Sequence, residues 1–233
     1  MLREIVIDTE TTGLDASNGD RLIEIGCVEI FNRIPTGREF HHYLNPERDV
    51  HPDAAAVHGL STEFLKDKPL FRHVVADFLA FVGDAALVAH NAAFDLGFIN
   101  AELARLSCAL LSAERMVDTL MLARRKHPAG PNSLDALCKR YGIDNSARAK
   151  HGALLDALLL ASVYVELLGE RQATLGLEHA AFSAGPIGAG AGTAAQRPVP
   201  LPPRIGPEVE RAHRHFVQSL GPQALWLRFA AAT

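Results

Sequence analysis

Apolar and polar residues alternate with two different periods along the first two-thirds of the chain. Alternation predicts a strand at 21–31, a buried apolar run predicts one at 4–8, and short segments at 38–46 and 85–91 predict two more. A helical period predicts helices over 69–83, 93–106, 119–127, 132–142 and 151–169. Gly37, just before the third strand, suits a hairpin turn. Consecutive strands followed by helices that cross to a further strand predict an α/β fold, with a mixed sheet flanked by helices.

The pattern changes after the last of these helices. No Asp, Glu, Lys or Arg occurs from His179 to Gln196, and the surrounding stretch is rich in Ala, Gly and Pro. Such a composition predicts a flexible linker over 178–207. An amphipathic segment then fills 208–233, in which Val209, Ala212, Phe216 and Leu220 fall on one helical face. An apolar face beyond a long tether favours a partner-binding segment over docking back onto the chain's own first domain, 1–177.

Composition excludes several classes of protein. No apolar run is long enough to cross a membrane, and the first residues lead directly into a strand, so we expect a cytoplasmic protein. Cys27, Cys108 and Cys138 are far apart, which argues against a zinc site or a disulfide framework. The net charge of −4 argues against tight binding of long duplex DNA.

One segment is locally basic. Between residues 119 and 150 the chain has seven Lys or Arg residues against two acids. For a charge run alone, a solvated surface is the better interpretation.

Four carboxylates in three segments occupy positions that the pattern makes unusual. Asp8 and Glu10 are two residues apart at the end of the first strand, so their side chains share a face. Asp95 lies in the first turn of a predicted helix, which is also a common position for an acid that offsets the helix dipole. Asp156 lies on a helix that is apolar nearly all round, where an unpaired carboxylate is costly. His151 precedes that helix and is expected on the loop that enters it.

Convergence of these groups would create a metal centre. Four neighbouring carboxylates repel each other, and divalent cations relieve the repulsion. Ligand sets made only of oxygen favour Mg²⁺ or Mn²⁺ over zinc. Two such ions could stabilise the attacking and leaving oxygens in phosphodiester hydrolysis, with His151 as the general base.

Three segments, "DTETTG", "HNAAFD" and "HGALLD", resemble in order the three motifs of the DEDDh 3′→5′ exonucleases. Longer flanking segments, such as "RLIEIGCVEIFNR" and "NSLDALCKRYGIDNS", are similar to the proofreading subunits of bacterial DNA polymerase III within that family. The resemblance covers about residues 1–177 and returns at about 208–229. It implies an RNase H-like fold and a metal-dependent exodeoxyribonuclease that removes mispaired 3′-terminal nucleotides.

The resemblance also implies roles for individual residues. Asp8, Glu10, Asp95 and Asp156 would hold two Mg²⁺ or Mn²⁺ ions, and His151 would be the base. Candidates for contacting the 3′ end of the DNA, besides Asp8 and Glu10, are Thr11, Asp53, His58, Asn91 and Phe94. The family usually has Glu at the position of Asp53.

The tail resembles segments that bind other replication proteins. A sliding-clamp motif would be formed by Gln172, Leu175 and Leu177, and the final leucine, where an aromatic is frequent, predicts a weak contact. Anchoring to the polymerase (alpha) subunit would fall to Phe216, Leu225 and Trp226. Whether a small accessory subunit binds the first domain is left open by the sequence.

Two other functions compete with proofreading. An RNA-trimming exonuclease of the same family would use the same chemistry, but it has no use for the linker and tail. An inactive scaffold that only ties polymerase to clamp is disfavoured, because all four carboxylates and His151 are present.

Overall fold

The computed structural model describes residues 2–148, 150–169 and 205–221. The chain divides into two units, residues 1–177 and 178–233. The first contains a five-stranded sheet in the order β3-β2-β1-β4-β5. β1 runs parallel to β4, and β4 runs parallel to β5, whereas β2 is antiparallel to both β1 and β3. The predicted mixed sheet is thus confirmed.

The strands largely follow the expected apolar segments. Their bounds are β1 Arg3–Thr11, β2 Leu22–Phe31, β3 Ile34–Tyr43, β4 Ala86–Ala89 and β5 Met116–Asp118. The hairpin turn predicted at Gly37 is wrong. The chain turns at Asn32 and Arg33, both with positive φ, and Gly37 lies inside β3. Two left-handed residues match the twist of a two-residue hairpin, and asparagine tolerates that conformation well.

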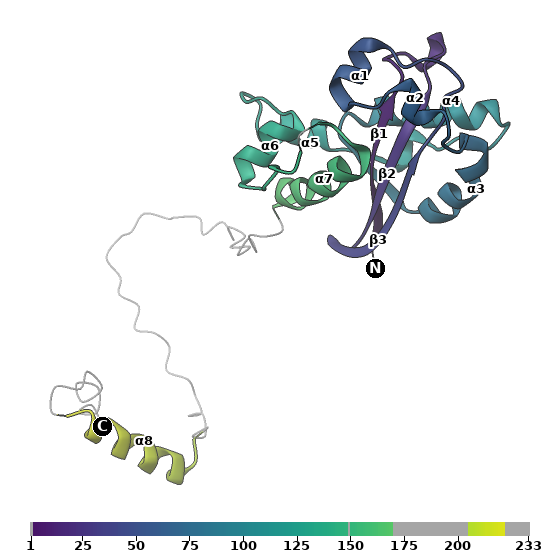
Figure 1. Cartoon of the computed structure of the whole chain (residues 1–233). Helices are drawn as coiled ribbons and strands as arrows, with labels where there is room; N and C mark the ends of the chain where they lie inside the picture. The colour runs from purple at the N-terminus through teal and green to yellow at the C-terminus, as the bar shows by residue number, and fades with distance from the viewer. Residues whose placement is uncertain (1, 149, 170–204, 222–233) are drawn as a thin grey trace, which may run out of the picture. The chain divides into compact units, whose positions relative to one another are not determined.

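Helices cover both faces of the sheet (Figure 1). On one face lie α3 (Phe71–Val82) and α4 (Ala92–Arg105), which pack into a core with apolar residues of the sheet such as Ile5 and Ile7. On the other lie α5 (Thr119–Lys126), α6 (Leu134–Tyr141) and α7 (Ala153–Leu168), whose core includes Val6 and Val28. Because neighbouring side chains of a strand point to opposite faces, β1 contributes to both cores.

The short elements were not predicted from the pattern. They are α1 (Pro52–His58), α2 (Thr62–Leu65), β5 and the 3₁₀ turns η1 (Ala16–Asn18) and η2 (Ala113–Arg115). None of these elements exceeds seven residues, so none is long enough to show a clear period. Side-chain caps define the starts of the short helices instead, such as Ser61, whose hydroxyl accepts a hydrogen bond from the Phe64 amide in α2.

Gly26 sets how closely α7 approaches the sheet. It lies opposite Asp8 in the β1–β2 pair. A Cβ atom at this position would lie 2.3 Å from both the carbonyl carbon of Ala153 and the nitrogen of Leu154. Only glycine therefore lets the start of α7 rest on β2. This contact places the first turn of α7 directly over the end of β1 that carries Asp8.

The described part of the second unit is an amphipathic helix, α8 (Pro207–Ser219). Val209, Phe216 and Leu220 are each more than half exposed. The helical spacing of Val209 and Phe216 is consistent with α8, and the partner-binding role of the segment 208–233 stays a prediction. Across the described residues of both units, no helix combines the length and apolar character needed to traverse a bilayer.

Candidate active site

The carboxyl end of β1 brings two carboxylates to one face of the sheet. Asp8 is half-buried and Glu10 is buried at the edge of the α7 side. Glu4 and Val6 come before them on β1 at intervals of two residues, and both contact α7. The Tyr164 hydroxyl donates to Glu4 at 2.9 Å, and Val6 packs in the same hydrophobic core as the apolar residues of α7. The alternation that packs this face therefore continues into Asp8 and Glu10.

Asp95 reaches the same end of β1 from the opposite layer. Asn91 in the left-handed conformation (φ 69°) ends the connection from β4, and α4 starts directly after it. Asp95 in the first turn is buried, and its carboxylate accepts a hydrogen bond from the Thr9 hydroxyl at 2.8 Å. A helix-dipole role alone would leave such an acid at the surface, so the bond to β1 favours a site role.

α7 supplies the fourth carboxylate. Asp156 is only 2% exposed, in the first turn of a helix whose other buried residues are apolar apart from the Tyr164 hydroxyl. His151 lies before the helix, as predicted, and its Nδ1 atom is 3.4 Å from Asp156 Oδ2. One ligand atom each from Glu10, His151 and Asp156 lie within 4.8 Å of one another.

Burial and mutual repulsion mark Asp8, Glu10, Asp95 and Asp156 as one carboxylate cluster. Burial, followed by the charges of Asp95, Glu10 and Asp156, raises the pKa of Asp8 well above its usual range. Burial raises the pKa of Glu10 to about 8, with Glu24, Asp156 and Asp95 adding to the effect. Burial also raises the pKa of Asp95 to about 7, opposed by its bond to Thr9. Cations placed among these groups would relieve the repulsion.

Two residues that the sequence did not single out adjoin the carboxylate cluster. Glu24 of β2 is buried directly opposite Glu10 in the strand pair. Arg148 forms a two-pronged ion pair with Asp156, although it belongs to the basic stretch interpreted as solvated surface. For Arg148 that interpretation is wrong, because its side chain is only 6% exposed. Neither Glu24 nor Arg148 belongs to a recognisable sequence motif, so only the tertiary contacts show that they adjoin the cluster.

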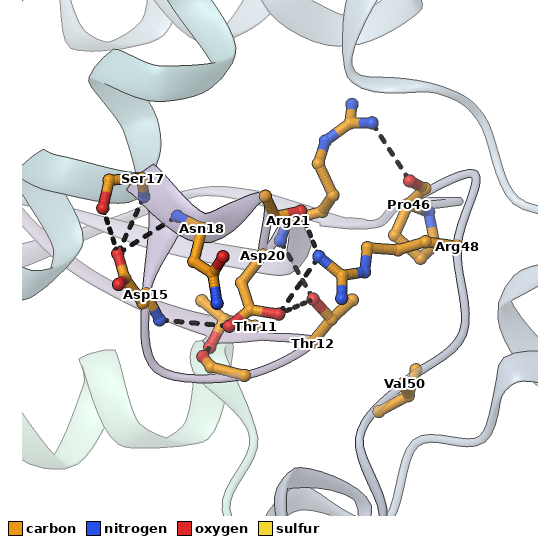
Figure 2. Close-up of polar contacts among 12 residues, drawn as sticks. Thr11, Thr12, Asp15, Ser17, Asn18, Asp20, Arg21, Pro46, Arg48 and Val50 are labelled. Atoms are coloured by element: carbon orange, nitrogen blue, oxygen red, sulfur yellow. Dashed lines mark hydrogen bonds and ion pairs between the residues drawn. The ribbon is translucent and has the colours of Figure 1, made fainter.

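The loop that follows Glu10 is fixed by its own hydrogen bonds (Figure 2). Asp20 accepts from the Thr12 hydroxyl and the Asp15 amide, both at 3.1 Å, and pairs with Arg48 at 3.2 Å. Arg21 donates to the Pro46 carbonyl at 3.1 Å and forms a buried pair with Glu102 of α4. These bonds tie the β1–β2 loop to α4 and to the segment before α1.

The residues expected to contact DNA lie in different surroundings. His58, at the end of α1, is buried, and its Nε2 atom has no hydrogen-bond partner among the described residues. Thr11 is buried and donates to the Gly13 carbonyl at 2.6 Å, whereas Asn91 is exposed at the start of α4. Phe94 is half-buried against Phe98, with ring centroids 4.9 Å apart. Asp53 is an exposed residue in the first turn of α1, with 95% of its side chain accessible.

The predicted partner-binding residues fall mostly beyond the part of the chain that the structure describes. Gln172, Leu175, Leu177, Leu225 and Trp226 lie outside the described residues. Phe216 lies on α8 and is 62% exposed.

The donor set of the carboxylate cluster fits divalent metal ions. Its members offer oxygen ligands from three elements, β1, α4 and α7, and the three described cysteines form no disulfide. Hard ions prefer such oxygen ligands. A cation bound beside Asp8, Glu10 and Asp95 would favour their ionised carboxylates and so oppose the rise in pKa that burial causes.

Comparison with known proteins gives the same picture at the level of sequence. Residues 5–164 match the family model described as "Exonuclease". The chain is 56% identical over 174 residues to DNA polymerase III subunit epsilon of Rickettsia felis, covering 73% of this chain and 76% of that protein. It is 49% identical over 174 residues to the protein of the same name from Escherichia coli K12, covering 72% of each.

Solved structures agree with the fold. Exonuclease X in complex with 5′-overhanging duplex DNA matches with a TM-score of 0.58 and 26% identity, over 72% of this chain and 92% of that one. Escherichia coli exonuclease I bound to a dT13 oligonucleotide matches with a TM-score of 0.62 over 73% of this chain and 42% of that one. At 18% identity, this second match supports the RNase H-like fold alone.

Proposed function

Because the chain belongs to the exonuclease family, we propose that it is the 3′→5′ proofreading exodeoxyribonuclease of a bacterial DNA polymerase III. It would hydrolyse the terminal phosphodiester bond of a primer that ends in a mispaired nucleotide. The identity of about half over most of both chains supports this assignment to the epsilon subunits, more specifically than the fold does.

Convergence of the carboxylate cluster is the observation that carries the proposal. Asp8 and Asp156 are 148 positions apart in the chain, yet the charge of Asp156 acts on the pKa of Asp8. A structural role alone does not explain four acids collected near the end of one buried strand, since the charges of Asp95, Glu10 and Asp156 raise the cost of ionising Asp8.

Asp8, Glu10, Asp95 and Asp156 would hold two divalent ions, Mg²⁺ or Mn²⁺, in this proposal. When bound, such ions lower the pKa of water and stabilise the charge of attacking and leaving oxygens. The chain's own contribution is to fix the ligands from three rigid elements. The close approach at Gly26 sets the position of Asp156 relative to Asp8.

His151 is the proposed general base. Its side chain is 46% exposed and adjoins Asp156, so it can reach both the cluster and solvent. A neutral imidazole can accept the proton of an attacking water at one nitrogen and pass it to solvent.

Selection of mispaired ends would come from access to the site. A mismatched terminus frays at lower cost than a paired one, so a site that admits unpaired nucleotides favours it. Thr11, Asp53, His58, Asn91 and Phe94 are proposed to line the path of the terminal nucleotides. The unpartnered Nε2 atom of buried His58 supports its part in this, because a ligand group could satisfy it.

The tail is proposed to bind the replication machinery. Phe216, Leu225 and Trp226 would anchor the chain to the polymerase alpha subunit, and Gln172, Leu175 and Leu177 would contact the sliding clamp. The exposed apolar residues of α8 support the first contact. A tether of this kind raises the local concentration of the nuclease at the primer end, which offsets the weak DNA binding expected of an acidic chain.

The decisive experiment compares paired and 3′-mismatched DNA primers, with Mg²⁺ or with EDTA, for the unchanged chain and Asp8→Ala. We expect faster removal of mismatched ends, no hydrolysis in EDTA and none by Asp8→Ala, while circular dichroism shows both proteins folded. The exposed carboxylate of Asp84 provides a matched control, and Asp84→Ala should remain active. Full activity of Asp8→Ala would refute the metal assignment, and preference for RNA would favour the trimming alternative.

A further inference from the structure

Arg148 occupies both oxygen atoms of the Asp156 carboxylate. Its Nε atom is 2.5 Å from Oδ1 and its Nη2 atom is 2.6 Å from Oδ2. The two side chains are 6% and 3% exposed. A buried guanidinium that grips a carboxylate in this two-pronged way is held by geometry as well as by charge.

The same guanidinium reaches two more groups. Its Nη2 atom donates to Nδ1 of His151 at 2.8 Å, and its Nη1 atom lies 2.6 Å from Asp135 Oδ1 on α6. Arg148 thus connects the proposed base, one member of the carboxylate cluster and an acid outside it. The Asp135 side chain is 56% exposed and lies outside the carboxylate cluster, so its bond to Arg148 does not depend on the contact between Arg148 and Asp156.

A divalent ion and Arg148 would compete for Asp156 in this arrangement. An ion would approach a carboxylate oxygen to about 2.1 Å. The guanidinium already lies 2.5–2.6 Å from each oxygen, so two cations would stand side by side within a few ångströms. Their repulsion in a largely dry site is large compared with thermal energy.

We propose that Arg148 is a positioning residue that neutralises Asp156 and holds His151 while the metal is absent, and that it yields Asp156 to the incoming ion and stays paired with Asp135. Metal binding would then also free Nδ1 of His151, so loading of the site and release of the base are one event. This inference rests on the proposed metal-dependent function. It assigns Arg148 to the resting state of the site and gives it no contact with the reacting atoms.

The alternative is that Arg148 only stabilises the fold. A purely structural arginine would, when removed, lower the stability of the protein equally with and without metal, and would leave metal affinity unchanged or weaker. Competition predicts instead that removal of Arg148 tightens metal binding, because the ion no longer has to displace the guanidinium from Asp156.

The experiment measures Mn²⁺ affinity and thermal unfolding of the full chain without DNA. The variants are Arg148→Met and Arg148→Lys, with Lys150→Met as the matched control. Lys150 lies in the same segment and approaches Gly59, so its loss removes a nearby charge without touching Asp156. We expect Arg148→Met to bind Mn²⁺ at least about 5-fold tighter than the unchanged chain. This gain in affinity should exceed the gain that Lys150→Met shows. Arg148→Met should melt lower in EDTA, and Mn²⁺ should raise its melting temperature by more than it raises that of the unchanged chain.

Arg148→Lys keeps the charge but not the two-pronged grip, and it covers the case in which Arg148→Met does not fold in EDTA. It should bind Mn²⁺ with intermediate affinity. Equal or weaker Mn²⁺ binding by the folded Arg148 variants would overturn the inference while leaving the proposed function intact. Absence of Mn²⁺ binding by the unchanged chain would overturn both.

Discussion

Glu10 and Glu24 are direct partners in the antiparallel β1–β2 pair, so two buried carboxylates share one face of the sheet at the edge of the site. Glu24 is held by His41, whose Nε2 atom lies 2.7 Å from its Oε1. After burial, the charge of Glu24 is the largest cause that raises the pKa of Glu10 to about 8. A metal ion must therefore displace a proton from Glu10 at neutral pH.

Glu24→Gln should let Mn²⁺ bind at lower pH. The amide keeps a hydrogen-bonding group beside His41 but removes the charge, so the pKa of Glu10 falls. We expect the pH of half-maximal Mn²⁺ binding to drop by about one unit, measured by calorimetry across a pH series. Glu29→Gln is the control, because Glu29 lies further along β2 with Arg3 and Arg38. An unchanged midpoint in Glu24→Gln would show that the two carboxylates do not interact.

Metal removal should make stability depend on pH through Glu10. Its pKa rises from 4.5 to about 8 on folding, so the folded chain binds this proton more tightly than the unfolded chain does. The stabilisation is complete below about pH 4.5 and is lost as pH rises to about 8. In EDTA, the melting temperature of Glu10→Gln should therefore rise relative to that of the unchanged chain as the pH increases through this window.

Comparison with Glu10→Gln cancels the contributions to stability that the two proteins share. In saturating Mn²⁺ the unchanged chain should instead have the higher melting temperature, since the ion binds its intact cluster more tightly than it binds the cluster of Glu10→Gln. A melting-temperature difference that stays constant with pH would contradict the assigned shift of Glu10.

His151→Ala should separate turnover from metal binding. Loss of a general base typically slows hydrolysis by about 10²–10⁴-fold, and we expect a reduction of that size in single-turnover digestion of a mismatched primer. Mn²⁺ binding should persist, because the four carboxylates remain. Unchanged turnover would remove His151 from the role of base.

Gly26→Ala tests the contact that places α7 on the sheet. The new methyl group would collide with the backbone at Ala153, at a cost of about 1–3 kcal/mol in the free energy of unfolding, and should weaken Mn²⁺ binding by displacing Asp156. Gly97→Ala is the matched control. Gly97 lies exposed in the interior of α4, and a Cβ atom added there would meet no neighbouring atom within 4 Å, so alanine should stabilise by about 0.5–1 kcal/mol. Urea unfolding measures both, and equal effects would refute the close-approach argument.

Deletion of residues 208–233 should release the polymerase alpha subunit without affecting hydrolysis of single-stranded DNA. Gel filtration with the purified alpha subunit measures the first effect, and digestion of an oligonucleotide measures the second. Asp8→Ala in the full chain should show the reverse, with binding kept and hydrolysis lost. Co-elution of the shortened chain with the polymerase would contradict the anchoring role of the tail.

Sequence reasoning located the parts of the site that local pattern encodes. Asp8 ends an apolar run and Asp156 interrupts an apolar helix, so each stands out against its neighbours. Arg148 lies in a segment whose charge looks like ordinary surface, and only burial against Asp156 distinguishes it. Glu24 sits within an alternating strand, where its importance depends on register with Glu10. Tertiary pairing of this kind leaves no period in the sequence.

The turn at Asn32 and Arg33 was missed for a related reason. Gly37 is the stronger turn signal, but the pairing of β2 with β3 continues beyond it to Ile34. A register shift between Val28 and Ile30 accommodates the extra residues of β3 around Gly37. Local preference for a turn was outweighed by the hydrogen bonds that the longer β2–β3 pair gains.

α7 is the last element in chain order among the described residues of the first unit, yet it packs on β1 and β2, the first two strands. Asp156 therefore joins Asp8 only after nearly the whole unit has been synthesised. A nascent chain that has reached α6 has an uncovered sheet face and lacks one of its four acids. Completion of the carboxylate cluster and completion of the fold thus coincide, and a prematurely terminated chain would expose apolar surface and lack Asp156.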